Sequence, residues 1–218
     1  MTSVDYSNQT DIFNPERFTW PVHIIGLGGI GGSLLFPLVK LGIGEVHLWD
    51  DDVVVPHNLP SQLIYRPSDV GQPKVVAAQA FLERQESGCV VQTHAVRVGP
   101  ETTLQGIVIS GVDSMASRKA IWQVVRFSFE IPLYLDGRIG GERLQLLSCR
   151  PSDVDGIERY ERTLFSDDEA SPLPCAARAV IHPVVTLAGL IITQLTLFAR
   201  NEEVRPNIMA HLQSLQFV

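Results

Sequence analysis

A glycine-rich run near the N-terminus is the first place where residue type and spacing could do chemistry. The run GLGGIG, residues 26–31, follows the apolar stretch 22–25 and precedes a helical pattern over 33–41. Glycines between a strand and a helix allow a tight turn, and they bring free N–H groups and the positive end of the helix dipole close to a phosphate. The run therefore indicates a nucleotide site, although a tight turn without a ligand has the same sequence.

An acidic run follows the second predicted strand, 42–50, which ends at Asp50. Asp50 lies close to the offset of about 20 residues expected for an acid that binds the ribose hydroxyls of a nucleotide. The same acid would bind NAD in a dehydrogenase and ATP in an adenylyltransferase, so the glycines and Asp50 leave both classes open.

The next loop favours ATP. HNLPSQLIYRPSDVGQPK, residues 57–74, carries Asn58, Gln62, Arg66 and Lys74, the side-chain donors expected around a triphosphate, and a dehydrogenase has no role for them. Lys74 opens a predicted helix over 74–84, directly after Pro73, and proline is favoured in the first helical turn. From there Lys74 can reach back over a nucleotide; an exposed helical lysine is the alternative.

Two later strands also end in polar residues. Asp113, in GVDS after the predicted strand 105–110, is either a site residue or the N-cap of the helix that follows. Asp136 and Arg138 follow the strand 133–136, and ligands of an open parallel sheet collect beyond the carboxyl ends of its strands. Site membership and a surface ion pair on a glycine-rich turn are the two interpretations of this pair.

The elements that must position these residues alternate between strand and helix over the first two thirds of the chain. This order predicts an α/β, Rossmann-like fold, with a mostly parallel sheet, helices on both faces and some antiparallel strands on the C-terminal side. We expect one domain over 1–218, with an N-terminal arm over 1–20 and an irregular crossover loop over 150–180. The remaining expected elements are strands at 90–98 and 143–149, helices at 118–129 and up to Arg200, and a strand-like tail.

Composition limits the partners and the compartment. The net charge of -7 argues against a nucleic-acid partner, because phosphate backbones require a basic surface. The three cysteines form no CxxC pair, which disfavours structural zinc and a disulfide framework and fits a reducing cytoplasm. The apolar stretch 183–199 is short for a membrane span and contains threonine and glutamine, so we expect a packed helix and no membrane.

Taken in order, GLGGIG, LWDDD, HNLPSQ, DVGQPK and GVDSMASR resemble the ThiF/MoeB/ubiquitin-activating-enzyme-like family of adenylyltransferases. The resemblance is strong over residues 12–125, and the rest of the chain is similar to a compact branch found in phage and plasmid genomes. It implies a homodimer that binds ATP and Mg²⁺. The implied reaction adenylates the C-terminal carboxylate of a ubiquitin-like or sulfur-carrier-like β-grasp protein.

The resemblance also implies roles for single residues. Asp50 matches the ribose-binding acid, Lys74 the phosphate-binding lysine, Asp113 the aspartate associated with Mg²⁺, and Arg118 a structural partner. The nucleotide contacts implied in this way are Gly26, Gly28, Gly29, Gly31, Asp50, Asp52, Asn58, Gln62, Lys74 and Asp113.

Two departures concern cations near the α-phosphate. Ser61 stands where the family has an arginine, and Asn8 stands where a second arginine reaches into the partner subunit's site. Arg17, Arg66 and Arg138 are candidate substitutes. Without a substitute the chain would bind ATP and catalyse poorly, so a non-catalytic nucleotide-binding partner subunit remains an alternative, beside the NAD-dependent oxidoreductase.

The crossover loop contains Cys175, directly before the last long helix. Related activating enzymes often carry a thioester-forming cysteine there, and Arg178 or the helix N-terminus would favour the thiolate that attacks. A buried structural cysteine is the alternative. Cys89 and Cys149 fall in predicted strands and are expected in the core.

Overall fold

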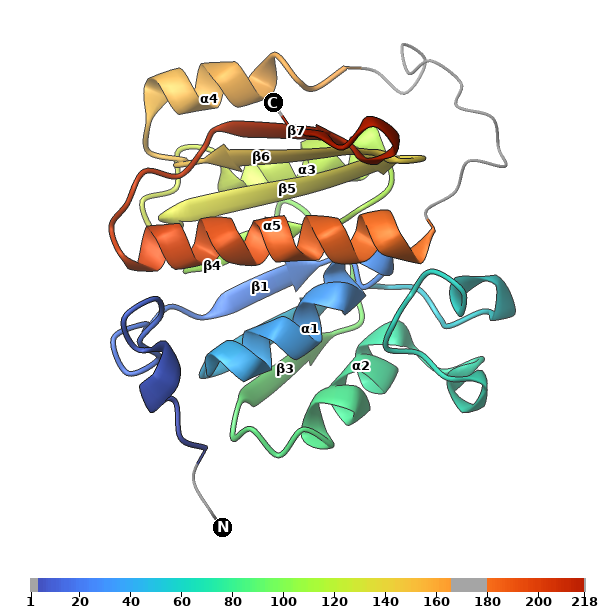
Figure 1. Ribbon diagram of the computed structural model, residues 1–218. Helices are drawn as coiled ribbons and strands as arrows, with labels where there is room; N and C mark the ends of the chain where they lie inside the picture. Colours follow the sequence, from blue (N-terminus) through green and yellow to red (C-terminus); the bar gives the residue numbers. More distant parts are fainter. Residues whose placement is uncertain (1–3, 166–179, 218) are drawn as a thin grey trace.

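The computed structural model describes residues 4–165 and 180–217, and its centre is a mixed eight-stranded sheet of order β3-β2-β1-β4-β5-β6-β7-β8 (Figure 1). The strands are β1 (Val22–Ile25), β2 (Glu45–Trp49), β3 (Val90–His94), β4 (Ile107–Ser110), β5 (Leu133–Gly140), β6 (Arg143–Cys149), β7 (Asn207–His211) and β8 (Gln216–Phe217). Strands β1 to β5 pair in parallel, and β6, β7 and β8 continue the sheet antiparallel. This arrangement confirms the predicted Rossmann-like fold and its antiparallel C-terminal side.

Helices cover both faces of the sheet, as predicted. They are α1 (Gly29–Leu41), α2 (Lys74–Glu83), α3 (Met115–Val125), α4 (Val154–Glu161) and α5 (Ile181–Ala199). One hydrophobic cluster joins the sheet to α1, α2 and α5, and a second joins the opposite face to α3 and α4. Short 3-10 turns lie at Ser7–Gln9, Pro56–Asn58, Pro67–Asp69 and Leu212–Ser214.

Helix α5 is the apolar stretch near the C-terminus. Among the described residues it is the one helix whose length and composition would allow it to cross a membrane. Here it packs against α1, β5 and β6 (Figure 1). Its residues Leu187, Ile191 and Leu195 are fully buried. The prediction of a packed helix is therefore confirmed.

The expected irregular loop over 150–180 is wrong in its first part, because residues 154–161 form α4. The carboxylate of Asp153 accepts a hydrogen bond from the N–H of Gly156, which satisfies one of the free donors at the helix start. Ile157 and Tyr160 are buried one turn apart against α3 and the sheet. A cap and one narrow buried face suffice for this helix although most of its residues are polar.

Several element boundaries also differ from the expected ones; α3, for example, spans 115–125 and not 118–129. Helix α1 begins at Gly29 and not at Ser33, so part of the glycine run belongs to its first turn. Strand β5 continues past Asp136 to Gly140, because residues 137–140 pair antiparallel with β6 in a hairpin.

The N-terminal arm packs at the end of α1 opposite to the glycine run. Nε2 of Gln9 donates to the carbonyl of Leu41 over 2.7 Å, and the hydroxyl of Tyr6 donates to the carbonyl of Val39. The arm lies beside the amino end of β1 (Figure 1). Asn8 is therefore far from the glycine run of its own chain.

Candidate functional site

The glycine run forms the tight turn that its sequence predicts. Gly26 has a φ of +87°, a conformation that favours glycine, and its N–H donates to the carbonyl of Trp49 over 2.8 Å. A Cβ on Gly31 would lie 1.9 Å from the carbonyl oxygen of Gly26, so only glycine fits there. Gly28 is the N-cap of α1 and provides no side-chain cap, so the first N–H groups of the helix have no partner within the helix.

The free space at the run lies above Gly28. A Cβ there would meet nothing closer than Nε2 of Gln62, at 4.0 Å. A Cβ on Gly29 would lie 3.1 Å from Val184 and 3.2 Å from the carbonyl oxygen of Ser61, so that side is closed. The helix N-terminus is thus open to a ligand on one side only, with position 61 at its border.

The loop after β4 packs directly on the glycine run. The N–H of Gly111 donates to the carbonyl of Ile25 over 2.9 Å, and a Cβ on Gly111 would lie 3.1 Å from the backbone nitrogen of Gly31. Asp113 follows in this loop, and its side chain is exposed. The glycine run and Asp113 therefore come to the same edge of the sheet.

Asp50 lies at the end of β2, against the glycine run. Its Oδ2 accepts a hydrogen bond from the N–H of Leu27 over 2.6 Å, and its Oδ1 accepts one from the N–H of Asp52 over 2.8 Å. Burial raises the pKa of Asp50, and the charge of Lys74 and the two N–H donors oppose that rise. The carboxylate is fixed in one orientation by the backbone.

Lys74 is a buried cation and not an exposed helical lysine. Its side chain is 8% exposed, and Nζ lies 2.8 Å from Oδ2 of Asp52 and 3.7 Å from Oδ2 of Asp50. The backbone N–H of Lys74 donates to the carbonyl of Asp52 over 2.9 Å, which holds the start of α2 against the end of β2. Lys74 therefore lies beside Asp50 and Asp52 at the end of β2.

The loop between β2 and α2 is tied to the glycine run by buried polar groups. Oδ1 of Asn58 accepts a hydrogen bond from the N–H of Val55, so Asn58 shapes the loop. The hydroxyl of Tyr65 donates to the carbonyl of Leu27 over 2.8 Å. Tyr65 was not predicted from the sequence; an aromatic residue inside a polar loop was the available signal.

Gln62 has a buried amide oxygen without a hydrogen-bond partner among the described residues, and its amide nitrogen lies beside Gly28. A buried polar atom without a partner is unfavourable, and a ligand or water at the open helix N-terminus could satisfy it. The residues present therefore fit a bound nucleotide.

Acidic groups suited to a metal ion lie at the same edge. Within the described ranges, carboxylate oxygens of Asp50, Asp51 and Asp52 lie within 4.8 Å of one another. Asp113, the predicted Mg²⁺ residue, is not part of this group. Asp113 is not the cap of α3 either, because Ser114 is: its Oγ accepts a hydrogen bond from the N–H of Ser117.

Asp136 lies inside the protein, so the interpretation as a surface ion pair is wrong. Its carboxylate is fully buried and accepts hydrogen bonds from Nε of Arg118 (3.1 Å), Nε of Arg138 (2.8 Å) and the hydroxyl of Tyr160 (2.9 Å). The two remaining guanidinium nitrogens of Arg138 donate to the carbonyl and to Oγ1 of Thr163, at 3.0 Å each. These groups bind one another and hold β5, α3 and α4 together.

The arginines proposed as substitutes lie in different places. Arg138 already donates hydrogen bonds to Asp136 and Thr163. Arg17 lines a groove of about 410 Å³ between the N-terminal arm and the end of α5, which also contains Arg200. Arg66 is exposed in the loop before α2. The sequence reasoning missed Arg97, whose Nε lies 2.8 Å from Oδ2 of Asp51.

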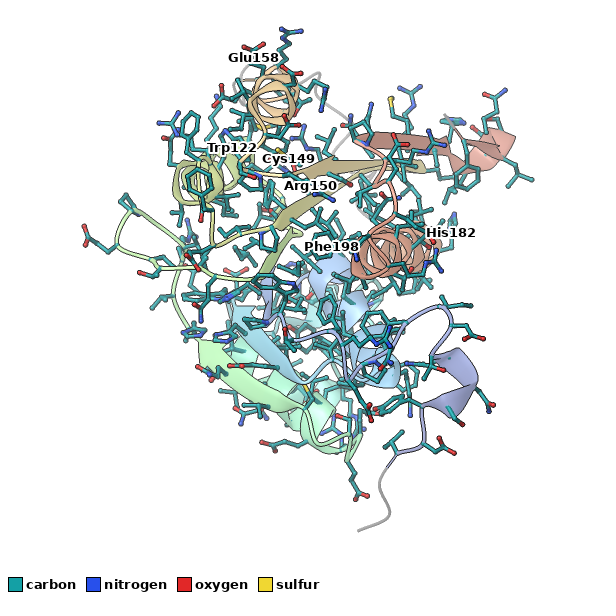
Figure 2. The ribbon with its side chains drawn as sticks, turned by 90° about the vertical axis from the view of Figure 1, so that its left-hand side faces the viewer. Trp122, Cys149, Arg150, Glu158, His182 and Phe198 are labelled. Carbon is teal, nitrogen blue, oxygen red and sulfur yellow. The ribbon has the colours of Figure 1, made fainter. Side chains whose placement is uncertain are left out.

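The two cysteines in the described part of the chain are free thiols in or near the core. Burial raises the pKa of Cys89 to about 11 and that of Cys149 to about 12, so neither is a ready nucleophile. Figure 2 shows Cys149 near Trp122, and both belong to the cluster under α3 and α4. Cys175 lies outside the described residues.

The fold and this edge of the sheet define a class: Rossmann-like α/β proteins with a glycine-rich turn at the carboxyl end of the first strand. Solved structures share the fold. The structure of E. coli MccB with ATP has a TM-score of 0.74 at 18% identity, covering 94% of this chain and 64% of that chain. PaaA has a TM-score of 0.71 at 18% identity, covering 99% of this chain and 77% of that chain.

The ThiF family model matches residues 17–214, and the chain belongs to the ThiF family.

Sequence relatives carry activating-enzyme names. The chain is 36% identical over 115 residues to the NEDD8-activating enzyme E1 catalytic subunit of Caenorhabditis elegans, covering 49% of this chain and 27% of the relative. It is 28% identical over 176 residues to the sulfur carrier protein ThiS adenylyltransferase of Escherichia coli, covering 78% and 68%. The adenylyltransferase and sulfurtransferase UBA4 of Meyerozyma guilliermondii is 28% identical over 178 residues, covering 76% and 39%. The chain thus spans well under half of the nematode and yeast proteins.

Proposed function

We propose that this protein is an ATP-dependent adenylyltransferase that activates the C-terminal carboxylate of a ubiquitin-like or sulfur-carrier-like β-grasp protein. The observation that carries the proposal is the position of Lys74, buried at the site with Nζ close to Asp50 and Asp52. Family membership and the names of the relatives support the carboxylate substrate, and they favour ATP over the NAD of an oxidoreductase.

In the proposed reaction a carboxylate oxygen of the substrate attacks the α-phosphorus of ATP. The new bond gives an acyl-adenylate, the bond from the α-phosphorus to the bridging oxygen breaks, and pyrophosphate leaves with that electron pair. Catalysis of such a step consists of positioning and charge stabilisation. The free N–H groups at the start of α1 and the ammonium of Lys74 supply positive charge, and the carboxylate of Asp50 accepts from the ribose hydroxyls.

Mg²⁺, held by Asp113, would neutralise phosphate charge in this site. The pairing of Lys74 with Asp52 is compatible with nucleotide binding, because Asp52 is 60% exposed and can return to water. Phosphate oxygens would then replace the carboxylate at Nζ.

Exchange of labelled pyrophosphate into ATP, driven by the β-grasp substrate, tests the proposal. Asp50→Ala and Lys74→Ala should each abolish exchange. Asp155→Ala and Lys40→Ala are the matched controls, because both residues are exposed and lie on α4 and at the end of α1. Full exchange in both site variants would rule out this function. A larger thermal shift with NAD than with ATP would favour the oxidoreductase.

We also propose a homodimer in the cytoplasm. The exposed side of α5, which includes Val185, and the N-terminal arm offer contact surface, and two-fold dimers are the commonest oligomers. The free thiols of Cys89 and Cys149 fit a reducing compartment. Light scattering should give twice the chain mass of 24.1 kDa at micromolar concentration. The mass of one chain would contradict the dimer.

Cys175 is proposed as an acyl acceptor: its thiolate attacks the acyl carbon of the adenylate, the thioester bond forms, and AMP leaves with the electron pair of the broken acyl–oxygen bond. The test is a non-reducing gel after incubation with ATP and the β-grasp substrate. A thiol-sensitive adduct is expected from the native chain and not from Cys175→Ala. Persistence of the adduct in that variant would exclude the role, and pyrophosphate exchange should survive in it.

A further inference from the structure

Arg97 faces the acidic edge of the candidate site from the connection between β3 and β4. Its Nε lies 2.8 Å from Oδ2 of Asp51, the residue after the predicted ribose-binding acid. The side chain of Arg97 is 75% exposed and that of Asp51 is 40% exposed, so both partners are accessible to a ligand. Asp51, Asp52 and Asp113 all raise the pKa of Arg97, which shows that carboxylates from the loops after β2 and β4 lie around it.

The charge balance of this edge requires such a cation. Four aspartates belong to it, namely Asp50, Asp51, Asp52 and Asp113, and ATP would add several negative charges. Lys74 is buried on the side of Asp50 and Asp52. Arg97 instead pairs with Asp51, whose negative charge has no ion pair with Lys74.

Two other arginines near the sheet edge, Arg118 and Arg138, are not available for this task. Arg118 and Arg138 are both bound to Asp136, and Arg138 also to Thr163, by several hydrogen bonds. Arg97, by contrast, is held by one exposed carboxylate. An exposed pair of this kind contributes little to stability, so a phosphate can displace Asp51 at small cost.

We propose that Arg97 is a phosphate-binding residue for ATP, held at the mouth of the site by Asp51 and transferred from Asp51 to phosphate oxygens when the nucleotide binds. This inference rests on the proposed function, since it names a further residue of the same nucleotide site. A guanidinium suits the role because its planar donors match phosphate oxygens. Arg97 then supplies positive charge in a chain that has Ser61 and Asn8 where its family has arginines.

If Arg97 leaves Asp51 for phosphate, substitutions of these two residues should change the affinity for MgATP in opposite directions. Isothermal titration calorimetry on the full chain measures this affinity. Arg97→Ala should weaken binding about tenfold or more, the loss expected for a charge-assisted hydrogen bond. Arg97→Lys should recover part of it. Asp51→Asn should tighten binding about two- to fivefold, because Arg97 no longer has to leave a carboxylate.

Combining the substitutions separates the exchange from simple charge removal. Asp51→Asn should tighten binding much less in the Arg97→Ala background, and equal tightening in both backgrounds would overturn the exchange. Adenosine is the second probe: an equal loss of adenosine and MgATP affinity in Arg97→Ala would overturn the phosphate contact. Arg162→Ala is the matched control, because Arg162, the C-cap of α4, is 78% exposed and has one carboxylate partner among the described residues, Glu158.

The same experiment distinguishes this inference from the proposed function. If the native chain binds no MgATP, the adenylyltransferase itself is refuted. If the native chain binds MgATP and Arg97→Ala binds it equally well, only the role of Arg97 is refuted. In pyrophosphate exchange, Arg97→Ala should raise the KM for ATP more than it lowers kcat.

Discussion

The backbone N–H of Leu27 donates a hydrogen bond to Oδ2 of Asp50 over 2.6 Å, and this bond joins the glycine run to the end of β2. The second carboxylate oxygen is held by the N–H of Asp52. An acid fixed by two backbone donors can present its remaining lone pairs to a ribose in one orientation. In the proposed site, the orientation of the nucleotide thus depends on this contact with the backbone turn.

Asp50→Asn tests this orientation at nearly constant size. An amide can accept from only one of the two N–H groups and turns its NH₂ toward the other, so we expect the KM for ATP in pyrophosphate exchange to rise about tenfold. The fold should remain, as judged by circular dichroism and by the urea midpoint. A KM equal to that of the native chain would contradict the assigned contact.

Gly31→Ala and Gly189→Ala form a matched pair, because the same change is made inside a helix. At Gly31 the new Cβ would lie 1.9 Å from the carbonyl oxygen of Gly26, so we expect a loss of several kcal/mol in unfolding free energy, or no soluble protein. At the exposed Gly189 nothing lies within 4 Å, and alanine should add about 0.5–1 kcal/mol. Urea unfolding measures both, and equal stability of the two variants would refute the steric argument.

Tyr160→Phe and Asp136→Ala test the buried group around Asp136. Removing the Tyr160 hydroxyl takes away one of three donors and should cost about 1–2 kcal/mol of unfolding free energy. Removing the carboxylate leaves Arg118 and Arg138 without their shared counter-charge and should cost about 3–5 kcal/mol. Urea unfolding measures these losses, and Arg162→Ala should change stability by less than about 0.5 kcal/mol. If Asp136→Ala lowers the unfolding free energy by less than about 0.5 kcal/mol, the buried carboxylate does not stabilise the fold.

His23 predicts how stability depends on pH. Its ring is buried on β1, stacks on His47 at 4.2 Å, and accepts a hydrogen bond from Nε1 of Trp49. Burial, with the neighbouring His47 and His94, lowers the pKa of His23 to about 4. Between pH 6.5 and about 4 the unfolded chain therefore binds a proton that the folded chain excludes, and stability falls as pH falls through this window.

The slope from this one group approaches about 1.4 kcal/mol per pH unit. Urea unfolding at pH 7.5, 6.5 and 5.5 should show a smaller pH dependence for His23→Gln than for the native chain. Glutamine keeps an acceptor for Trp49 and does not titrate, so it isolates the proton. Identical slopes for the two proteins would assign the acid sensitivity to other groups.

Most of the fold was predictable because its strands are short apolar runs next to glycines, as at Val22–Ile25 and Ile107–Ser110. Helix α4 was missed because its stability comes from Asp153 and from two buried side chains, Ile157 and Tyr160, in an otherwise polar segment. The average composition of a sequence window does not reveal two buried side chains within a polar segment.

Some residues of the site could likewise be predicted from the sequence, and others could not. The glycine run and Asp50 were predictable from their spacing along β1, α1 and β2, and Lys74 from its place at the start of the next helix. The burial of Asp136 does not, because its partners Arg118 and Tyr160 come from other parts of the chain. The pair of Arg97 and Asp51 could not be predicted from the sequence either, because it depends on how β3 lies beside β2.

The crowding at Gly29 has a consequence for how this sequence can change over generations. A Cβ at position 29 would lie 3.1 Å from a methyl group of Val184, in the first turn of α5. A substitution at either position therefore alters which residues are tolerated at the other. Homologues with alanine at position 29 should carry a smaller residue than valine at position 184, so the phosphate-binding turn and the start of the last helix are expected to evolve as a pair.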